Sequence, residues 1–160
     1  MGMITTSLGY SALDIAKWFV NSTDREAGDD ITHLKVQKLL YYAQGWSLVQ
    51  FDKPLFNEAM QAWVHGPVVP SVWSHLKDHG WVSIPLQRLN KRVPTIHAGL
   101  LIAINERYGI YTAKKLEKMT HEETPWRRAR GNLPVHERCT NVISLEDMKA
   151  YFQSVQAAAA

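Results

Sequence analysis

Two pairs of residues in this sequence come nearest to the spacing of a metal or catalytic site. His121 and Glu122 are adjacent, but a zinc-protease motif requires a second histidine one helical turn later, and position 125 is a proline. His136 and Cys139 lie three residues apart, yet a zinc site needs more protein ligands than these two, and the sequence offers no matching pair. We therefore expect neither a metal nor a cofactor.

Motifs for covalent catalysis are missing as well. Cys139 is the single cysteine, and whether it meets one of the seven histidines in space is a question that the sequence leaves open. The sequence contains no glycine-rich phosphate loop and no GxSxG nucleophile elbow. We predict that the protein is not an enzyme, and the weaker alternative is a hydrolase that uses His121 and Glu123.

A basic cluster, PWRRARG at residues 125–131, combines Trp126 with Arg127, Arg128 and Arg130. Such a cluster can contact phosphates and stack on a base, which favours nucleic-acid binding. Arginines beside an aromatic residue are also enriched in protein interfaces, where they suit an acidic partner. We expect Arg128 to be solvated, with Trp126 anchoring a short helix, and we keep Arg127 and Arg130 as candidate contacts.

Composition is that of a folded domain. The 160 residues are 46% hydrophobic and 21% charged, with a net charge of +3 and a pI near 9.0, which is too mild a bias to indicate nucleic-acid binding by itself. A single cysteine predicts no internal disulfide and a reducing cytoplasm. The first twenty residues lack a basic start, and Asp14 and Lys17 interrupt their apolar stretches, so we expect neither a signal peptide nor a membrane span.

Helical periodicity and capping residues predict the elements that must position these side chains. The second predicted helix is apolar nearly all round, which is typical of a central helix, and Gly45 inside it predicts a close neighbour or a local bend. Helices are expected over residues 11–21, over 32–51, from Pro70 to Gly80, after Pro94 to Gly109, from Thr112, from a capping Thr124 before Pro125, and after Ser144.

Two short runs, 58–64 and 81–84, alternate like strands and are expected to pair with each other on either side of a helix. The predicted fold class is mainly α (α+β): a single compact helical domain with a small two- or three-stranded β element. It covers residues 1–156. The alanine-rich tail, residues 157–160, has nothing to pack against and is expected to fray or to be unstructured.

The stretch WVHGPVVPSVW, residues 63–73 and hereafter the corner, is unusually rigid and apolar. Two prolines reduce the entropy of the loop, so it predicts a stiff connection from a strand to a helix, with Trp63 and Trp73 facing the core. A pre-ordered loop is also a good binding surface, because little freedom is lost on association.

Three blocks in order carry a family resemblance: LKVQKLLYYAQGW at 34–46, PLFNEAMQAWVHGPVVPSVW at 54–73 and THEETPWRRAR at 120–130. Together they resemble the Panacea antitoxin domain, also called the SocA-like or GepA (phage-associated protein) family, over roughly residues 10–130. The resemblance implies a non-enzymatic protein of prophages or other mobile elements that neutralises a toxin from the adjacent gene by direct contact. In the SocA branch it implies an adaptor that presents the toxin to the ClpXP protease.

The resemblance also implies which positions matter. Leu39, Tyr41, Tyr42, Gly45 and Trp46 match the family on the central helix and are expected to build the fold. A nucleic-acid-binding regulator of a prophage or mobile element remains the alternative function. The candidate partner-binding residues are His65, Gly66, Pro67, Val68, His121, Glu123, Trp126, Arg127 and Arg130.

Overall fold

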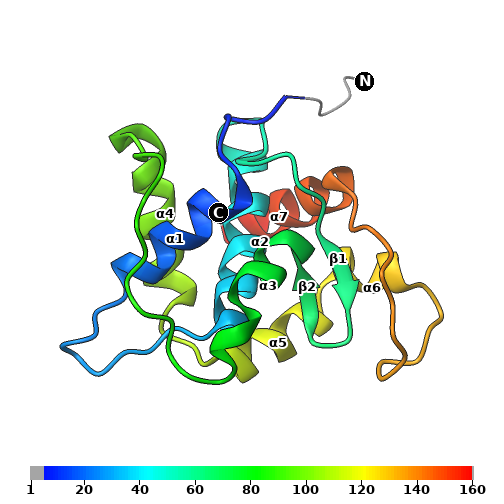
Figure 1. Cartoon of the computed structure of the whole chain (residues 1–160). Helices are drawn as coiled ribbons and strands as arrows, with labels where there is room; N and C mark the ends of the chain where they lie inside the picture. The colour runs from blue at the N-terminus through cyan, green and yellow to red at the C-terminus, as the bar shows by residue number, and fades with distance from the viewer. Residues whose placement is uncertain (1–5, 160) are drawn as a thin grey trace.

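The computed structural model describes residues 6–159 and shows a mainly α fold built around one helix (Figure 1). Helix α2 (His33–Gln50) runs through the centre and is contacted by the other large elements of the domain. These are α1 (Ala12–Ser22), α3 (Pro70–Leu76), α4 (Thr95–Tyr108), α5 (Ala113–His121) and α7 (Leu145–Ala159). The short helix α6 (Thr124–Arg130) packs against α7 and the small sheet. The predicted fold class is confirmed.

Helix α2 is central because apolar side chains cover it on every side. Residues 36–45 are all buried, and ten consecutive positions cover every face of the helix, as its sequence predicts. The sequence predicts either a close neighbour or a local bend at Gly45, and the structure shows a close neighbour. A Cβ atom at this position would lie 2.1 Å from Cε2 of Phe152 on α7.

Local capping signals place most helix starts correctly. Ser11 and Asp14 form a reciprocal capping box at α1, and Thr32, Thr112 and Ser144 accept backbone N–H groups at the starts of α2, α5 and α7. Helix α6 differs, because its N-cap is Glu123 rather than Thr124. The carbonyl oxygen of Glu123 already accepts the N–H of Arg127, so the helix begins one residue earlier than predicted.

The sheet is a two-stranded hairpin inside the corner itself. Strands β1 (Gln61–Trp63) and β2 (Gly66–Val68) pair antiparallel, with Trp63 opposite Gly66. The prediction of a strand within 58–64 is confirmed, but its expected pairing with 81–84 is wrong. Gly66, at φ +102°, lets the chain reverse directly after a two-residue loop, so the nearest partner is the next segment of the chain.

Residues 81–84 follow α3 and the 3-10 helix η1 (Lys77–His79) in irregular structure. The N–H of Ile84 donates to the carbonyl oxygen of Ile31, which fixes this segment beside the start of α2. The outer edge of β1 is met instead by a distal segment, since the N–H of Ala62 donates to the carbonyl oxygen of Asn141. The corner is therefore a hairpin that leads into α3, and not a strand-to-helix connection alone.

The sequence predicts no signal peptide at the start of the chain and a frayed or unstructured tail at its end. Helix α7 continues through Ala159, so residues 157–159 are helical rather than unstructured, although their side chains are exposed. Residues 1–5, where the absence of a signal peptide was expected, and Ala160, the last residue of the tail, lie outside the described residues. Within residues 6–159, every helix is too short or too polar to cross a membrane.

Candidate functional site

An apolar groove of about 550 Å³ lies beside the hairpin, and we call it the tryptophan groove. Its most prominent residue is Trp81, of which 77% is exposed to solvent. Contiguous exposed apolar surface rimmed by polar residues, more than a single exposed side chain, marks sites of interaction. The groove is lined by Trp63, Trp73 and Trp81, by Leu34, Val64 and Val68, and by His33, Gln37, His65, Arg138, Cys139 and Thr140.

The two tryptophans of the corner lie in this groove and not in the core, so the prediction that they face the core is wrong. Successive strand side chains point to opposite faces, and the burial of Ala62 therefore turns Trp63 outwards. The rings of Trp63 and Trp73 meet edge to face with centroids 5.5 Å apart, and the ammonium of Lys77 lies 5.0 Å above the Trp73 ring. The groove therefore has rigid aromatic walls and a positive charge at its rim.

His65 occupies the exposed tip of the hairpin and fastens it to α5. Its Nδ1 lies 2.5 Å from Oε1 of Glu117, whose other carboxylate oxygen lies 3.6 Å from the ammonium of Lys114. Burial acts to raise the pKa of Glu117, but the hydrogen bond and charge of His65, followed by the charge of Lys114, outweigh it and lower that pKa. The carboxylate of Glu117 is thus held between His65 and Lys114.

Gly66, Pro67 and Val68, which were expected to contact a partner, are buried in the fold. The ammonium of Lys38 donates a hydrogen bond to the carbonyl oxygen of Pro67, 3.0 Å away. A Cβ atom on Gly66 would lie 2.7 Å from Cε of Lys38, which is why glycine is required there. Of the three, Val68 also lines the groove.

The distal block joins the corner through an aromatic stack. His121 and Trp126 are nearly parallel, with ring centroids 4.1 Å apart, and burial lowers the pKa of His121. The indole N–H of Trp126 donates to the carbonyl oxygen of Trp63 at 2.8 Å. Trp126 itself is buried, so it supports the groove from behind and does not offer a surface.

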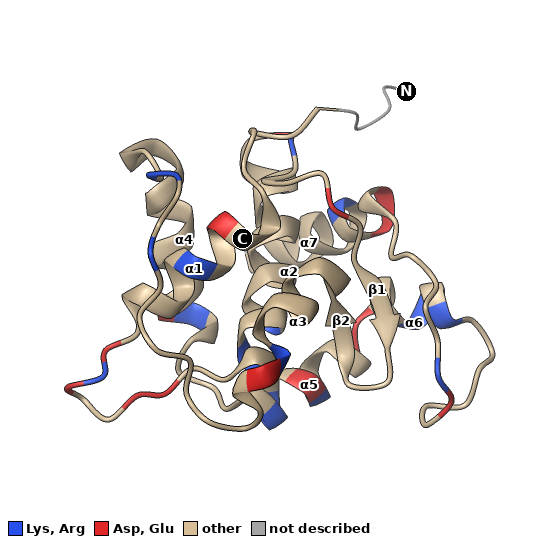
Figure 2. Cartoon of the chain, in the orientation of Figure 1, with Lys and Arg blue, Asp and Glu red and all other residues tan. Residues whose placement is uncertain are grey.

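Part of helix α6 is blue in Figure 2 because it carries arginines. The three arginine side chains have different surroundings. Arg130 is buried, and its guanidinium donates to the carbonyl oxygens of Ala62, Pro134, Val135 and Glu137. Arg128 is exposed, as expected, and lies 3.1 Å from Asp147. Arg127 is exposed and forms no ion pair within the described residues. The expectation that Arg130 contacts a partner is therefore replaced by a structural role, and the cluster retains little charge for binding phosphates.

Glu123 does not line the tryptophan groove, although it was expected to act beside His121. Its two carboxylate oxygens accept hydrogen bonds from the hydroxyls of Tyr41 and Tyr42, both at 2.9 Å. Burial raises the pKa of Glu123 to about 7, against the opposing effect of these hydrogen bonds. The Glu123 side chain lies in a different part of the molecule. It lines a separate cavity together with residues of α4, α5 and α7.

Sequence reasoning missed Lys38 and the exposure of Trp81. Lys38 is completely buried, which is rare for a lysine. Its signal was a lysine on a helix that is apolar nearly all round, because such a helix has few positions that can reach water. The sequence pattern predicts a strand at Trp81. No feature of the neighbouring sequence indicates that this tryptophan is exposed to solvent.

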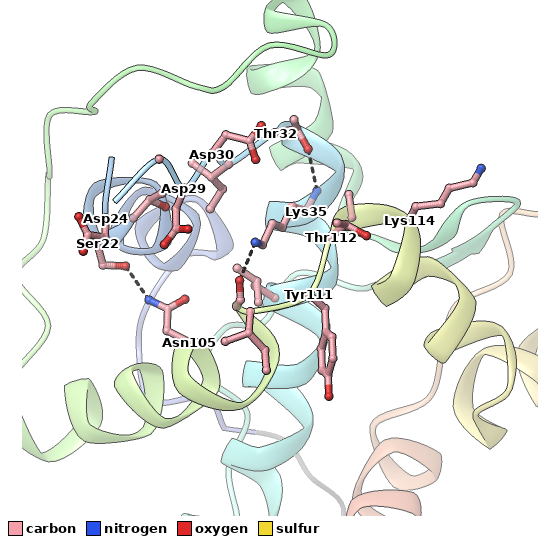
Figure 3. Close-up of a pocket in the computed structure, with 17 residues that line it drawn as sticks. Ser22, Asp24, Asp29, Asp30, Thr32, Lys35, Asn105, Tyr111, Thr112 and Lys114 are labelled. Atoms are coloured by element: carbon pink, nitrogen blue, oxygen red, sulfur yellow. Dashed lines mark hydrogen bonds between the residues drawn. The ribbon is translucent and has the colours of Figure 1, made fainter. Parts of the chain in front are cut away.

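Another cavity, of about 700 Å³, lies between the α1–α2 connection and the α4–α5 connection (Figure 3). Its polar residues chiefly hold those connections together. The ammonium of Lys35 donates to the carbonyl oxygen of Gly109 at 2.7 Å, and the amide of Asn105 donates to the hydroxyl of Ser22 at 2.9 Å. Here and elsewhere in residues 6–159, no three histidine, cysteine or acidic side chains come close enough to hold a metal ion.

A known protein family matches the central part of the chain. The family model described as antitoxin SocA-like, Panacea domain matches residues 36–127, from α2 into α6. The antitoxin SocA of Caulobacter vibrioides (strain NA1000 / CB15N) is 42% identical over 59 residues, which are 36% of this chain and 31% of that protein. The match thus spans just under a third of the length of this relative. No solved structure matches the chain.

Proposed function

The chain belongs to the antitoxin SocA-like, Panacea domain family, and we propose that it neutralises a cognate toxin by binding that protein directly through the tryptophan groove. Family membership suggests an antitoxin role without catalytic activity and a toxin partner in general. The observation that supports this particular surface is the set of three tryptophans around one apolar groove, with Trp81 77% exposed. Tryptophan is among the residues that contribute most to protein–protein binding energy.

The rim of the groove indicates the chemistry of the toxin segment. Lys77 stacks over Trp73, Arg138 lines the groove, and the nearby carboxylate of Glu117 is engaged in contacts with His65 and Lys114. The surface is therefore apolar with an excess of positive charge. It suits a toxin segment that presents apolar side chains flanked by Asp or Glu.

The predicted partner-binding residues take separate roles in this proposal. His65 and Val68 line the groove, and exposed Arg127 extends the positive charge on α6. His121 and Trp126 support the hairpin through their stack and the bond to Trp63. Gly66, Pro67 and Arg130 shape the fold, and Glu123 lines a separate cavity.

Co-expression with the product of the adjacent gene tests the proposal. We expect this chain to rescue growth and to co-purify with that protein, and Trp81→Ala to weaken binding by about tenfold or more. Ile96→Ala, at a side chain 68% exposed on α4, is the matched control that should bind normally. A toxin that is harmless alone, or capture unaffected by Trp81→Ala, contradicts the proposal.

Two modes of neutralisation are compatible with such a surface. The bound antitoxin can cover the active part of the toxin, or it can deliver the toxin to the ClpXP protease as an adaptor. The half-life of the toxin separates them. Delivery requires the toxin to disappear faster when both this chain and the protease are present, whereas covering leaves the half-life the same whether or not the protease is present.

A further inference from the structure

A second cavity, of about 260 Å³, lies between α4, α5 and α7, away from the tryptophan groove. Among the residues that line it, Glu123 carries a negative charge and Arg107 a positive one, and most of the others are aromatic or apolar. The cavity is large enough for one side-chain-sized group and too small for a segment of protein. Its lining residues are Arg107, Tyr108, Tyr111, Met119, Glu123, Tyr151, Phe152 and Val155.

Glu123 is buried and forms no ion pair with any residue from 6 to 159, although Arg107 lines the same cavity. The hydroxyls of Tyr41 and Tyr42 donate hydrogen bonds to it, and hydrogen bonding by Tyr151 and the charge of Arg107 also act to lower its pKa. A carboxylate can accept more hydrogen bonds than these tyrosines supply. A buried carboxylate without an ion pair is costly, so its position beside an open cavity leaves room for a cation that pairs with it directly.

The walls of the cavity are suited to a planar cation. Tyr108 stacks on Tyr42 with ring centroids 3.8 Å apart, and this stacking fixes the position of the Tyr108 ring in the cavity wall. The guanidinium of Arg107 lies 5.2 Å from the Tyr108 ring and 5.0 Å from the Trp46 ring. The mouth of the cavity therefore already accommodates a guanidinium on aromatic rings, although Arg107 does not pair with Glu123.

We propose that this cavity binds a guanidinium group on a slender chain, with the Glu123 carboxylate as its counter-ion and tyrosine rings as its walls. A guanidinium fits because its planar donors match a carboxylate and its face stacks on aromatic rings. The group can come from a small guanidine compound or from an arginine side chain of another protein. The inference goes beyond the antitoxin proposal and does not depend on it, because no toxin is needed to test it.

Titration calorimetry of the full chain with butylguanidinium, near pH 8 where Glu123 is mostly ionised, tests the proposal. Butylurea is the matched probe, since it has a similar shape and no charge. We expect butylguanidinium to saturate one site and butylurea to bind at least about tenfold more weakly. Glu123→Gln should weaken butylguanidinium by a similar factor. Glu106→Gln, an exposed carboxylate on α4, should not.

Arg107→Gln separates a cation site from an anion site. Removing the positive charge at the mouth should leave the affinity for butylguanidinium equal or higher, whereas a site for anions would lose its ligand. An arginine-containing pentapeptide, blocked at both ends, identifies the source. Tighter binding of the peptide than of butylguanidinium points to a protein side chain, and exclusion of the peptide points to a small molecule.

Three outcomes would overturn the proposal: no saturable binding of butylguanidinium, equal binding of butylurea, or full affinity in Glu123→Gln. If Glu123→Gln fails to fold, the two probes in the wild-type chain and in Arg107→Gln still decide between a charged and an uncharged site.

Discussion

The ammonium of Lys38 lies 3.0 Å from the carbonyl oxygen of Pro67 and ties the middle of α2 to strand β2. Lys38 is completely buried, and burial lowers its pKa to about 7, although the charge of Glu117 opposes the change. The hairpin that carries the corner is thus held by a group whose charge is costly inside the protein. This relationship makes stability sensitive to pH.

Lys38→Met should remove a pH dependence of stability on the alkaline side. An unfolded lysine keeps its proton up to about pH 10, whereas buried Lys38 releases it near pH 7, so the unfolded chain binds more protons between these values. The free energy of unfolding of the wild-type protein should therefore rise between about pH 7 and about pH 9, and Lys38→Met should lack that rise. Urea unfolding at several pH values measures both.

Lys118→Met is the control for this experiment, because Lys118 is exposed on α5. It should keep the wild-type rise. An equal rise in Lys38→Met would mean that the lysine is not the group that titrates.

Glu123→Gln should remove an opposite pH dependence on the acidic side. The pKa of Glu123 is raised from 4.5 to about 7 in the folded protein, so the folded chain binds more protons between these values. Stability should therefore fall as the pH rises from about 5 to about 7. The charged and titratable groups that face Glu123 are Tyr41, Tyr42, Tyr151 and Arg107.

Thermal or urea unfolding of Glu123→Gln across this range should give a flatter profile than the wild type, while Glu106→Gln keeps the wild-type profile. The two effects have opposite signs, and both groups titrate near pH 7. Wild-type stability should therefore pass through a minimum near pH 7. A wild-type profile without any decline between about pH 5 and about pH 7 would contradict the assignment.

Local features of this fold were predictable from sequence and non-local ones were not. The starts of α1 after Ser11 and of α3 at Pro70 depend on neighbouring residues, and both were predicted correctly. The pairing partner of β1 depends on how the chain folds back, and it was mispredicted because the hairpin turn lay inside a stretch that resembled a simple connection.

The candidate site shows the same division. The sequence brought His121 and Trp126 to attention, and the structure joins them to the corner through Trp63. It could not show that Arg130 would be enclosed, because the carbonyl groups that enclose it belong to β1 and to the loop after α6. Residue type alone favours an exposed arginine, so burial of this kind is visible only in the fold.

Gly45→Ala should destabilise the protein although alanine is the better helix former. The added Cβ would lie 2.1 Å from the ring of Phe152, and a buried aromatic ring between α2 and α7 cannot move away without disturbing its neighbours. We expect a loss of about 1–3 kcal/mol in the free energy of unfolding. Gly99→Ala in α4, where a Cβ would meet open space, should instead gain about 0.5–1 kcal/mol. A gain at both positions in urea unfolding would show that Phe152 yields.

Arg130→Lys should destabilise the protein more than Arg127→Lys, although the two residues are separated by less than one helical turn. The guanidinium of Arg130 bonds carbonyl oxygens on both sides of it, including those of Ala62 and Pro134, and a lysine ammonium cannot span that fork of acceptors. We expect a loss of about 2 kcal/mol or more, since buried carbonyl groups would be left unpaired, against about 0.5 kcal/mol or less at exposed Arg127. Amide hydrogen exchange localises the effect. The loop after α6 should open more readily in Arg130→Lys, and equal protection of that loop in both variants would mean that Arg130 does not hold it.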